Sequence, residues 1–105
     1  METPNLDYLK QISGGDIEFE KSMLAVLKLD FAIEYAAIQA NYEKNNFEQL
    51  ILDIHKIKNK IGILGMKKSL ALASECEKSI KKVKKEKFDD LLLILTKINV
   101  YLNNI

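Results

Sequence analysis

The chain has 105 residues, close to the usual size of one domain, and we expect a single domain over residues 1–105. Its 16 basic and 15 acidic residues nearly cancel, and every basic residue is lysine, which argues against a dedicated nucleic-acid-binding protein. A single cysteine excludes an intrachain disulfide, and no apolar run approaches the roughly 20 residues of a membrane-spanning helix, so we expect a soluble cytoplasmic protein.

The chain is predicted to be helical throughout, because glycine and proline are scarce and apolar residues recur at steps of three and four. Pro4 suits the first position of a short helix, Gly14 interrupts the chain, and Asp16 is a suitable N-cap for the next helix. Asn45 marks a turn, and Gly65 follows the third helix as a C-cap. The predicted helices span residues 4–12, 17–42, 47–64, 68–84 and 87–103.

Each long predicted helix has an apolar stripe that we expect to face a common core. The inward residues are Phe19, Met23, Leu27, Phe31, Tyr35, Ile38 and Tyr42; Phe47, Leu50, Ile51, Ile54, Ile57 and Ile61; Leu72, Ala73, Cys76, Ile80 and Val83; and Leu91, Ile94, Leu95, Ile98 and Leu102. Four long helices with short connections predict an all-α fold, an antiparallel four-helix bundle with a short additional N-terminal helix.

The only histidine, His55, lies at the edge of the third stripe. With Ile54 at the centre of the buried face, His55 is about 100° away, where solvent can reach it. Asn59 and Gly62 follow one and two turns later on the same side, and both are short. Lys58, three residues on, can present an ammonium group to an anion beside the imidazole, although a solvated lysine is the more frequent arrangement.

A docking surface for a partner protein is predicted around His55. Leu52 and Ile63 fall about 160° and 180° from the core centre, on the face expected to be wet, and together suggest a small apolar patch. Glu48 lies two turns before His55 and is assigned to the same surface, since one histidine and one glutamate make a poor zinc site. We therefore predict no metal site.

Residues 55–65, His-Lys-Ile-Lys-Asn-Lys-Ile-Gly-Ile-Leu-Gly, resemble the core motif of histidine-containing phosphotransfer (HPt) domains, roughly H-x-L-K-G-x-x-x-x-L-G. The lead-in around residues 6–9 and 13–16 and the apolar pattern of residues 70–77 are also similar, so that the resemblance covers nearly the whole chain. Asn59 departs from the glycine that usually follows the motif lysine. The matching residues are His55, Lys58, Gly62, Leu64 and Gly65, with Ile57 as a conservative match.

The resemblance implies a two-component phosphorelay. His55 would accept a phosphoryl group, through its outward ring nitrogen Nε2, from the aspartate of a response-regulator receiver domain, including one within a hybrid histidine kinase. Lys58 would offset phosphoryl charge, and Asn59 and Gly62 would shape the approach. The receiver would bring Mg²⁺, so we expect a monomeric phosphoryl carrier without a cofactor or kinase activity of its own.

Two other functions compete with this interpretation. The first is a non-catalytic helical adaptor that binds a partner through Leu52 and Ile63, with His55 incidental. The second is binding of nucleic acid or acidic membrane, for which a solvated lysine-rich helix end is the preferred alternative. We expect Glu75 and Glu77 to be surface charges. The lysines in question are Lys78, Lys81, Lys82, Lys84, Lys85 and Lys87.

Overall fold

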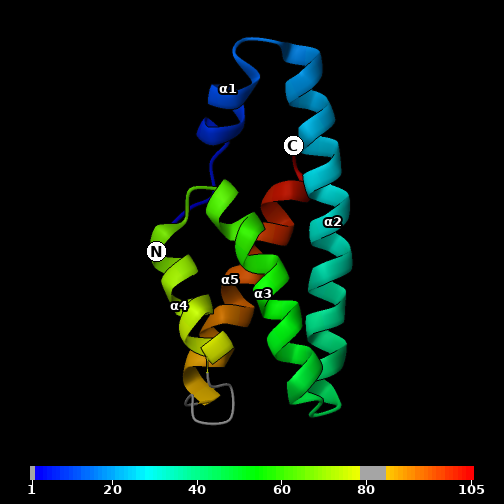
Figure 1. Ribbon diagram of the computed structural model, residues 1–105, viewed down its shortest axis with the longest axis vertical. Helices are drawn as coiled ribbons and strands as arrows, with labels where there is room; N and C mark the ends of the chain where they lie inside the picture. Colours follow the sequence, from blue (N-terminus) through cyan, green and yellow to red (C-terminus); the bar gives the residue numbers. More distant parts are fainter. Residues whose placement is uncertain (1, 79–84) are drawn as a thin grey trace.

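The computed structural model describes residues 2–78 and 85–105, and within them every regular element is an α-helix (Figure 1). The predicted inward residues Ile80 and Val83, and Lys81, Lys82 and Lys84 of the lysine-rich segment, lie outside the described residues. The described helices are α1 (Asp7–Ser13), α2 (Ile17–Glu43), α3 (Phe47–Ile63), α4 (Lys67–Lys78) and α5 (Lys85–Asn103).

The four longer helices lie side by side, and each runs in the direction opposite to the one before it (Figure 1). α3 packs against both α2 and α4, and α5 packs against both α4 and α2, so that these helices surround a common interior. The short α1 packs on α2. None of the helices in the described part of the chain combines the length and the apolar character that a membrane crossing requires.

One cluster of buried apolar side chains includes residues from all five helices. The predicted stripes supply most of it, and the residues confirmed as buried are Leu27, Phe31, Ile38, Leu50, Ile54, Ile57, Ile61, Ala73, Cys76, Leu91, Ile94, Leu95, Ile98 and Leu102. Phe19 is an exception, because its side chain is exposed. Steps of four from Phe19 to Leu27 rotate by about 40° each around the helix, which moves Phe19 off the buried face.

The turns on either side of α3 have the same backbone motif. After α2, Asn45 takes a positive φ of 56°, and Asn46 N–H donates to the Asn41 carbonyl at 2.9 Å. After α3, Gly65 has φ 78°, and Met66 N–H donates to the Ile61 carbonyl at 3.3 Å. Both are Schellman endings, in which a left-handed residue turns the chain back and satisfies the last carbonyls.

The predicted start of the first helix was wrong. α1 begins at Asp7, not at Pro4, because the preceding residues cross the α3–α4 turn instead of coiling. Asn5 N–H donates to the Leu64 carbonyl at 2.9 Å, and the Glu2 carboxylate accepts from the backbone N–H groups of Lys68 and Ser69. Burial opposes ionisation of Glu2, yet those hydrogen bonds lower its pKa. Glu2 therefore caps the first turn of α4.

The α2–α3 pairing is fixed by two polar contacts. Asp53 of α3 is buried and accepts hydrogen bonds from Asn41 Nδ2 of α2 at 2.6 Å and from Gln49 Nε2 at 3.0 Å. Lys60 Nζ lies 2.9 Å from Glu34 Oε2, with both side chains largely shielded from solvent. Partly buried, geometrically specific contacts of this kind fix the rotation of α3, and thereby the direction in which His55 points.

Replacing Gly65 by alanine is expected to lower the free energy of unfolding by about 1–3 kcal/mol. An added Cβ would lie 2.6 Å from Asn5 Nδ2, in addition to the strain of a positive φ. Gly14 is the matched control, since it also has a positive φ but has no atom within 4 Å of an added Cβ. Chemical denaturation should show a larger loss for Gly65→Ala than for Gly14→Ala; equal losses would show that the Asn5 contact contributes nothing.

Candidate functional site

His55 lies on the solvent side of α3, as its position beside the apolar stripe predicts. Its neighbours Ile54 and Ile57 are fully buried and fix the orientation of this helix turn. The His55 side chain is 69% exposed. The imidazole is therefore anchored by a rigid helix and open to an approaching molecule.

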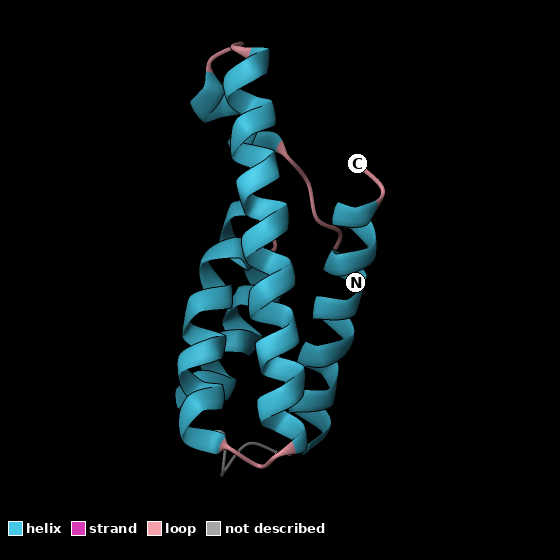
Figure 2. Cartoon of the chain, turned by 90° about the vertical axis from the view of Figure 1, so that its right-hand side faces the viewer, coloured by secondary structure: helices cyan, strands magenta, loops and turns pink. Residues whose placement is uncertain are grey.

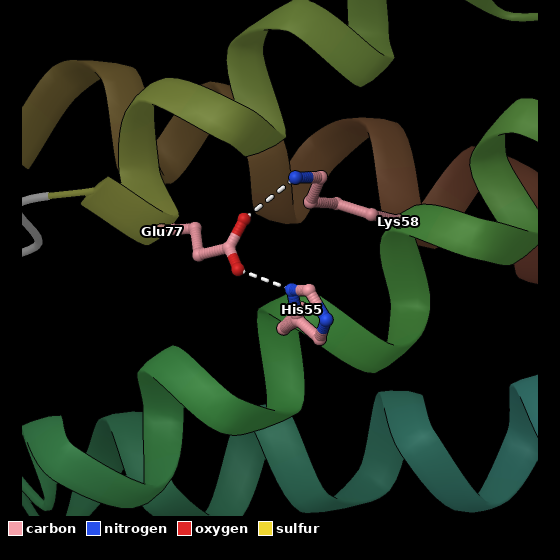
Figure 3. Close-up of polar contacts among 3 residues, drawn as sticks. All are labelled: His55, Lys58 and Glu77. Carbon is pink, nitrogen blue, oxygen red and sulfur yellow. Dashed lines mark hydrogen bonds and ion pairs between the residues drawn. The ribbon is translucent and has the colours of Figure 1, made fainter.

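A carboxylate from the neighbouring helix α4 contacts both His55 and Lys58 (Figure 3). His55 Nδ1 is hydrogen-bonded to Glu77 Oε1, and Lys58 Nζ donates to Glu77 Oε2 at 2.6 Å. The Glu77 side chain is only 20% exposed. The two oxygens of one carboxylate thus hold the two side chains that the sequence places at i and i+3.

The protonation state of Glu77 determines which nitrogen of His55 is available. The hydrogen bond from Lys58 holds the pKa of the Glu77 carboxyl below its ordinary value, against partial burial and with a further contribution from His55. An ionised carboxylate can only accept hydrogen bonds, so the proton lies on Nδ1 of His55 and is donated to Glu77. In the neutral ring, Nε2 then has a free lone pair. Figure 3 shows this nitrogen on the side of the ring away from Glu77.

An open groove of about 460 Å³ lies beside the imidazole. It brings together five residues that the sequence assigns to the site and adds Tyr8 from α1 and Leu70 from α4. Its lining combines apolar side chains with the polar groups of His55, Lys58 and Asn59, which suits contact with another protein surface. The lining residues are Tyr8, His55, Lys58, Asn59, Gly62, Ile63 and Leu70.

Gly62 is not required by the packing of the helices. A Cβ at this position would lie 3.7 Å from Leu70 Cδ2, which is ordinary van der Waals contact. An alanine would be a better helix former by about 0.5–1 kcal/mol. Glycine at this position therefore keeps the groove beside His55 open, although the packing of the helices does not require it.

Of the three predicted docking residues, only Ile63 lines the groove that contains His55. Leu52 and Glu48 are exposed on α3, but neither lines the groove that contains His55. Ile63 was expected on the wet face and is instead half-buried. Ile63 packs against the edge of the core cluster and lines a second groove with Leu9 and Ile12 of α1.

Glu77 is the site residue that sequence reasoning missed, since both Glu75 and Glu77 were expected to be surface charges. Glu75 does have that role: it is exposed and forms an ion pair with Lys87 at 2.7 Å. Lys78 is exposed, and the side chain of Lys85 lies outside the described residues. Within residues 2–78 and 85–105, no group of three or more histidine, cysteine or acidic side chains is arranged to hold a metal ion.

Comparison of the chain with protein-family models, curated proteins and solved structures finds no match. The site must therefore be interpreted from its own geometry and from the motif of residues 55–65.

Replacing Glu77 by alanine is expected to change the tautomer of His55, because the carboxylate that holds the proton on Nδ1 is lost. Two-bond ¹H–¹⁵N correlation spectra should show Nδ1–H in the wild type and a gain of Nε2–H in Glu77→Ala. Glu75→Ala is the control, since Glu75 is on the same helix and contacts Lys87 instead. Identical imidazole spectra for the wild type and Glu77→Ala would rule out this role of Glu77.

Proposed function

We propose that the protein is a histidine phosphotransfer protein, which accepts a phosphoryl group on His55 from the aspartyl phosphate of a response-regulator receiver domain and passes it on. The observation that carries the proposal is the hydrogen bond from His55 Nδ1 to Glu77, which leaves Nε2 as a free nucleophile beside an open groove. The similarity of residues 55–65 to the HPt motif supports the same function.

The transfer step requires no proton movement at the nucleophile. The Nε2 lone pair attacks phosphorus in line with the bond to the receiver aspartate; the N–P bond forms, the P–O bond breaks, and the aspartate leaves as a carboxylate. The ring becomes positively charged while its proton stays on Nδ1. Glu77, which accepts that proton's hydrogen bond, stabilises the cationic ring in both the transition state and the product.

Lys58 acts in two ways in this proposal. Its ammonium has three N–H donors, and one of them is used by Glu77. The others can donate to phosphoryl oxygens as the group arrives, which offsets the added negative charge. The Mg²⁺ that polarises the aspartyl phosphate belongs to the receiver domain, including a receiver within a hybrid histidine kinase. The protein is thus a cytoplasmic carrier without kinase activity of its own.

The arrangement of the helices supports the same role. We infer that α2, α3, α4 and α5 form an antiparallel four-helix bundle, to which α1 is the short addition, because each long helix packs on two others around one core. In such a bundle a histidine on the outer edge of α3 is held rigidly and remains accessible to a docking domain.

Replacing His55 by glutamine is expected to abolish labelling by phosphorylated receiver domains while the helical circular dichroism is retained, since the side chain is exposed. The label on the wild type should be labile in acid and stable in alkali, as a phosphohistidine is. Lys56→Gln, at the adjacent exposed position, is the control and should be labelled normally. Full labelling of His55→Gln, or no labelling of the wild type by any receiver, would contradict the proposal. The non-catalytic adaptor function would then be favoured.

Replacing Gly62 by alanine is expected to separate stability from function. The free energy of unfolding should stay the same or rise by about 0.5–1 kcal/mol, since the helix improves and the new Cβ meets only Leu70 at contact distance. The rate of transfer should fall by about tenfold or more, equivalent to about 1.4 kcal/mol, because the methyl group fills the groove beside His55. Unchanged transfer kinetics would mean that the partner does not enter this groove.

A further inference from the structure

Helix α2 has a second apolar face, on the side away from the core. Val26, Leu29 and Ile33 are 58%, 63% and 61% exposed, whereas Leu27 and Phe31 on the same helix are buried. Figure 2 shows α2 in front along its full length, with no other helix over it. Toward its N-terminal end, Ser22 and Val26 also line a groove with Ile12 of α1 and Ile63 of α3. We call the exposed row the outer seam, which consists of Ser22, Val26, Leu29, Ile33, Ala36 and Ala40.

The spacing of the outer seam is that of a coiled coil. Successive members are separated by four, three, four, three and four residues, which is a heptad repeat. Phe19, half exposed, extends the row by three residues toward the start of the helix. Single exposed apolar residues are normal on a protein surface, but a heptad row along a 27-residue helix about 40 Å long is not scattered. Such a row is typical of a helix that packs against another helix.

We propose that the partner is α2 of a second copy of this chain, aligned antiparallel, so that the protein forms a symmetric dimer. When the two helices are aligned with Leu29 of one copy opposite Ile33 of the other, every member of the outer seam lies opposite another member. Ile33 packs against Leu29 of the second copy, Val26 against Ala36, and Ser22 against Ala40. The exposed alanines Ala25 and Ala32 flank the seam and allow the two helices to approach closely.

The charges at the ends of α2 favour this pairing. Asp16, Glu18 and Glu20 lie at the start of the helix, whereas its end has one charge of each sign, Glu43 and Lys44. The antiparallel register places Lys44 of each copy beside Asp16 and Glu18 of the other. It also places the positive end of each helix dipole beside the negative end of the other, which is favourable. A parallel pair would bring the two acidic ends together.

Dimerisation would leave both phosphotransfer sites open. His55 and its groove lie on α3, α4 and α1, and no member of the outer seam lines that groove. Ser22 and Val26 line the neighbouring groove, which shares Tyr8, Asn59 and Ile63 with the groove beside His55. The dimer would therefore present two independent histidines, in place of the single histidine of the expected monomer. The inference does not depend on the proposed function, because no member of the seam lines the groove that contains His55.

The oligomeric state tests the proposal directly. Sedimentation equilibrium of the wild type should give twice the chain mass at high concentration, and the variant with Leu29→Lys and Ile33→Lys should give the chain mass. The matched control replaces Leu93 and Val100 of α5 by lysine; they are 49% and 55% exposed but lie outside the seam. A wild type that remains monomeric up to about 1 mM, or a control that dissociates equally, would overturn the proposal.

The direction of pairing is tested by crosslinking with a short bis-maleimide. Antiparallel helices bring the two copies of residue 32 together, so Ala32→Cys should crosslink to itself. Ala40→Cys should not, because residue 40 lies about 27 Å along the helix from its own copy. The native Cys76 is buried and burial raises its pKa to about 11, so it does not compete. Crosslinking of Ala40→Cys but not Ala32→Cys would overturn the antiparallel arrangement. His55→Gln should remain dimeric, which separates this test from that of the proposed function.

Discussion

One carboxylate, that of Glu77, receives hydrogen bonds from two side chains of the neighbouring helix, His55 and Lys58. The lysine keeps this carboxylate ionised, and the ionised carboxylate keeps the imidazole proton on Nδ1. The reactivity of the exposed nitrogen therefore depends on a contact at the opposite side of the ring. It depends equally on the packing of α3 against α4, because a small rotation of either helix would separate the three side chains.

The packing that holds this contact is fixed at both ends of α3. Left-handed residues, Asn45 before it and Gly65 after it, turn the chain so that α2 and α4 run back along its sides. The buried Asp53 fixes the rotation of α3 against α2, and Glu2 caps α4 across the same turn that Gly65 forms. These contacts hold the helix that carries His55, while the imidazole itself faces the open groove.

Much of this arrangement could be predicted from the sequence. Apolar periodicity placed Ile54 in the core and His55 at its edge, and Asp16 and Gly65 marked helix ends correctly. Periodicity within one helix could not place contacts between helices, which is why the role of Glu77 and the partial burial of Ile63 were missed. One signal for Glu77 existed: it lies twelve residues after Gly65 and His55 lies ten before it, so the two face each other in an antiparallel hairpin. Phe19 was misplaced because α2 has apolar residues on two faces, and a single stripe was assumed.

The nitrogen that becomes phosphorylated provides the most direct test of this account. Protein labelled with ¹⁵N-histidine and phosphorylated by a receiver domain can be examined by ³¹P and ¹⁵N NMR, which distinguishes the two phosphohistidine isomers. The structure predicts a bond from phosphorus to Nε2 of His55, with the proton retained on Nδ1 and hydrogen-bonded to Glu77. Phosphorylation at Nδ1, or at a residue other than His55, would contradict it.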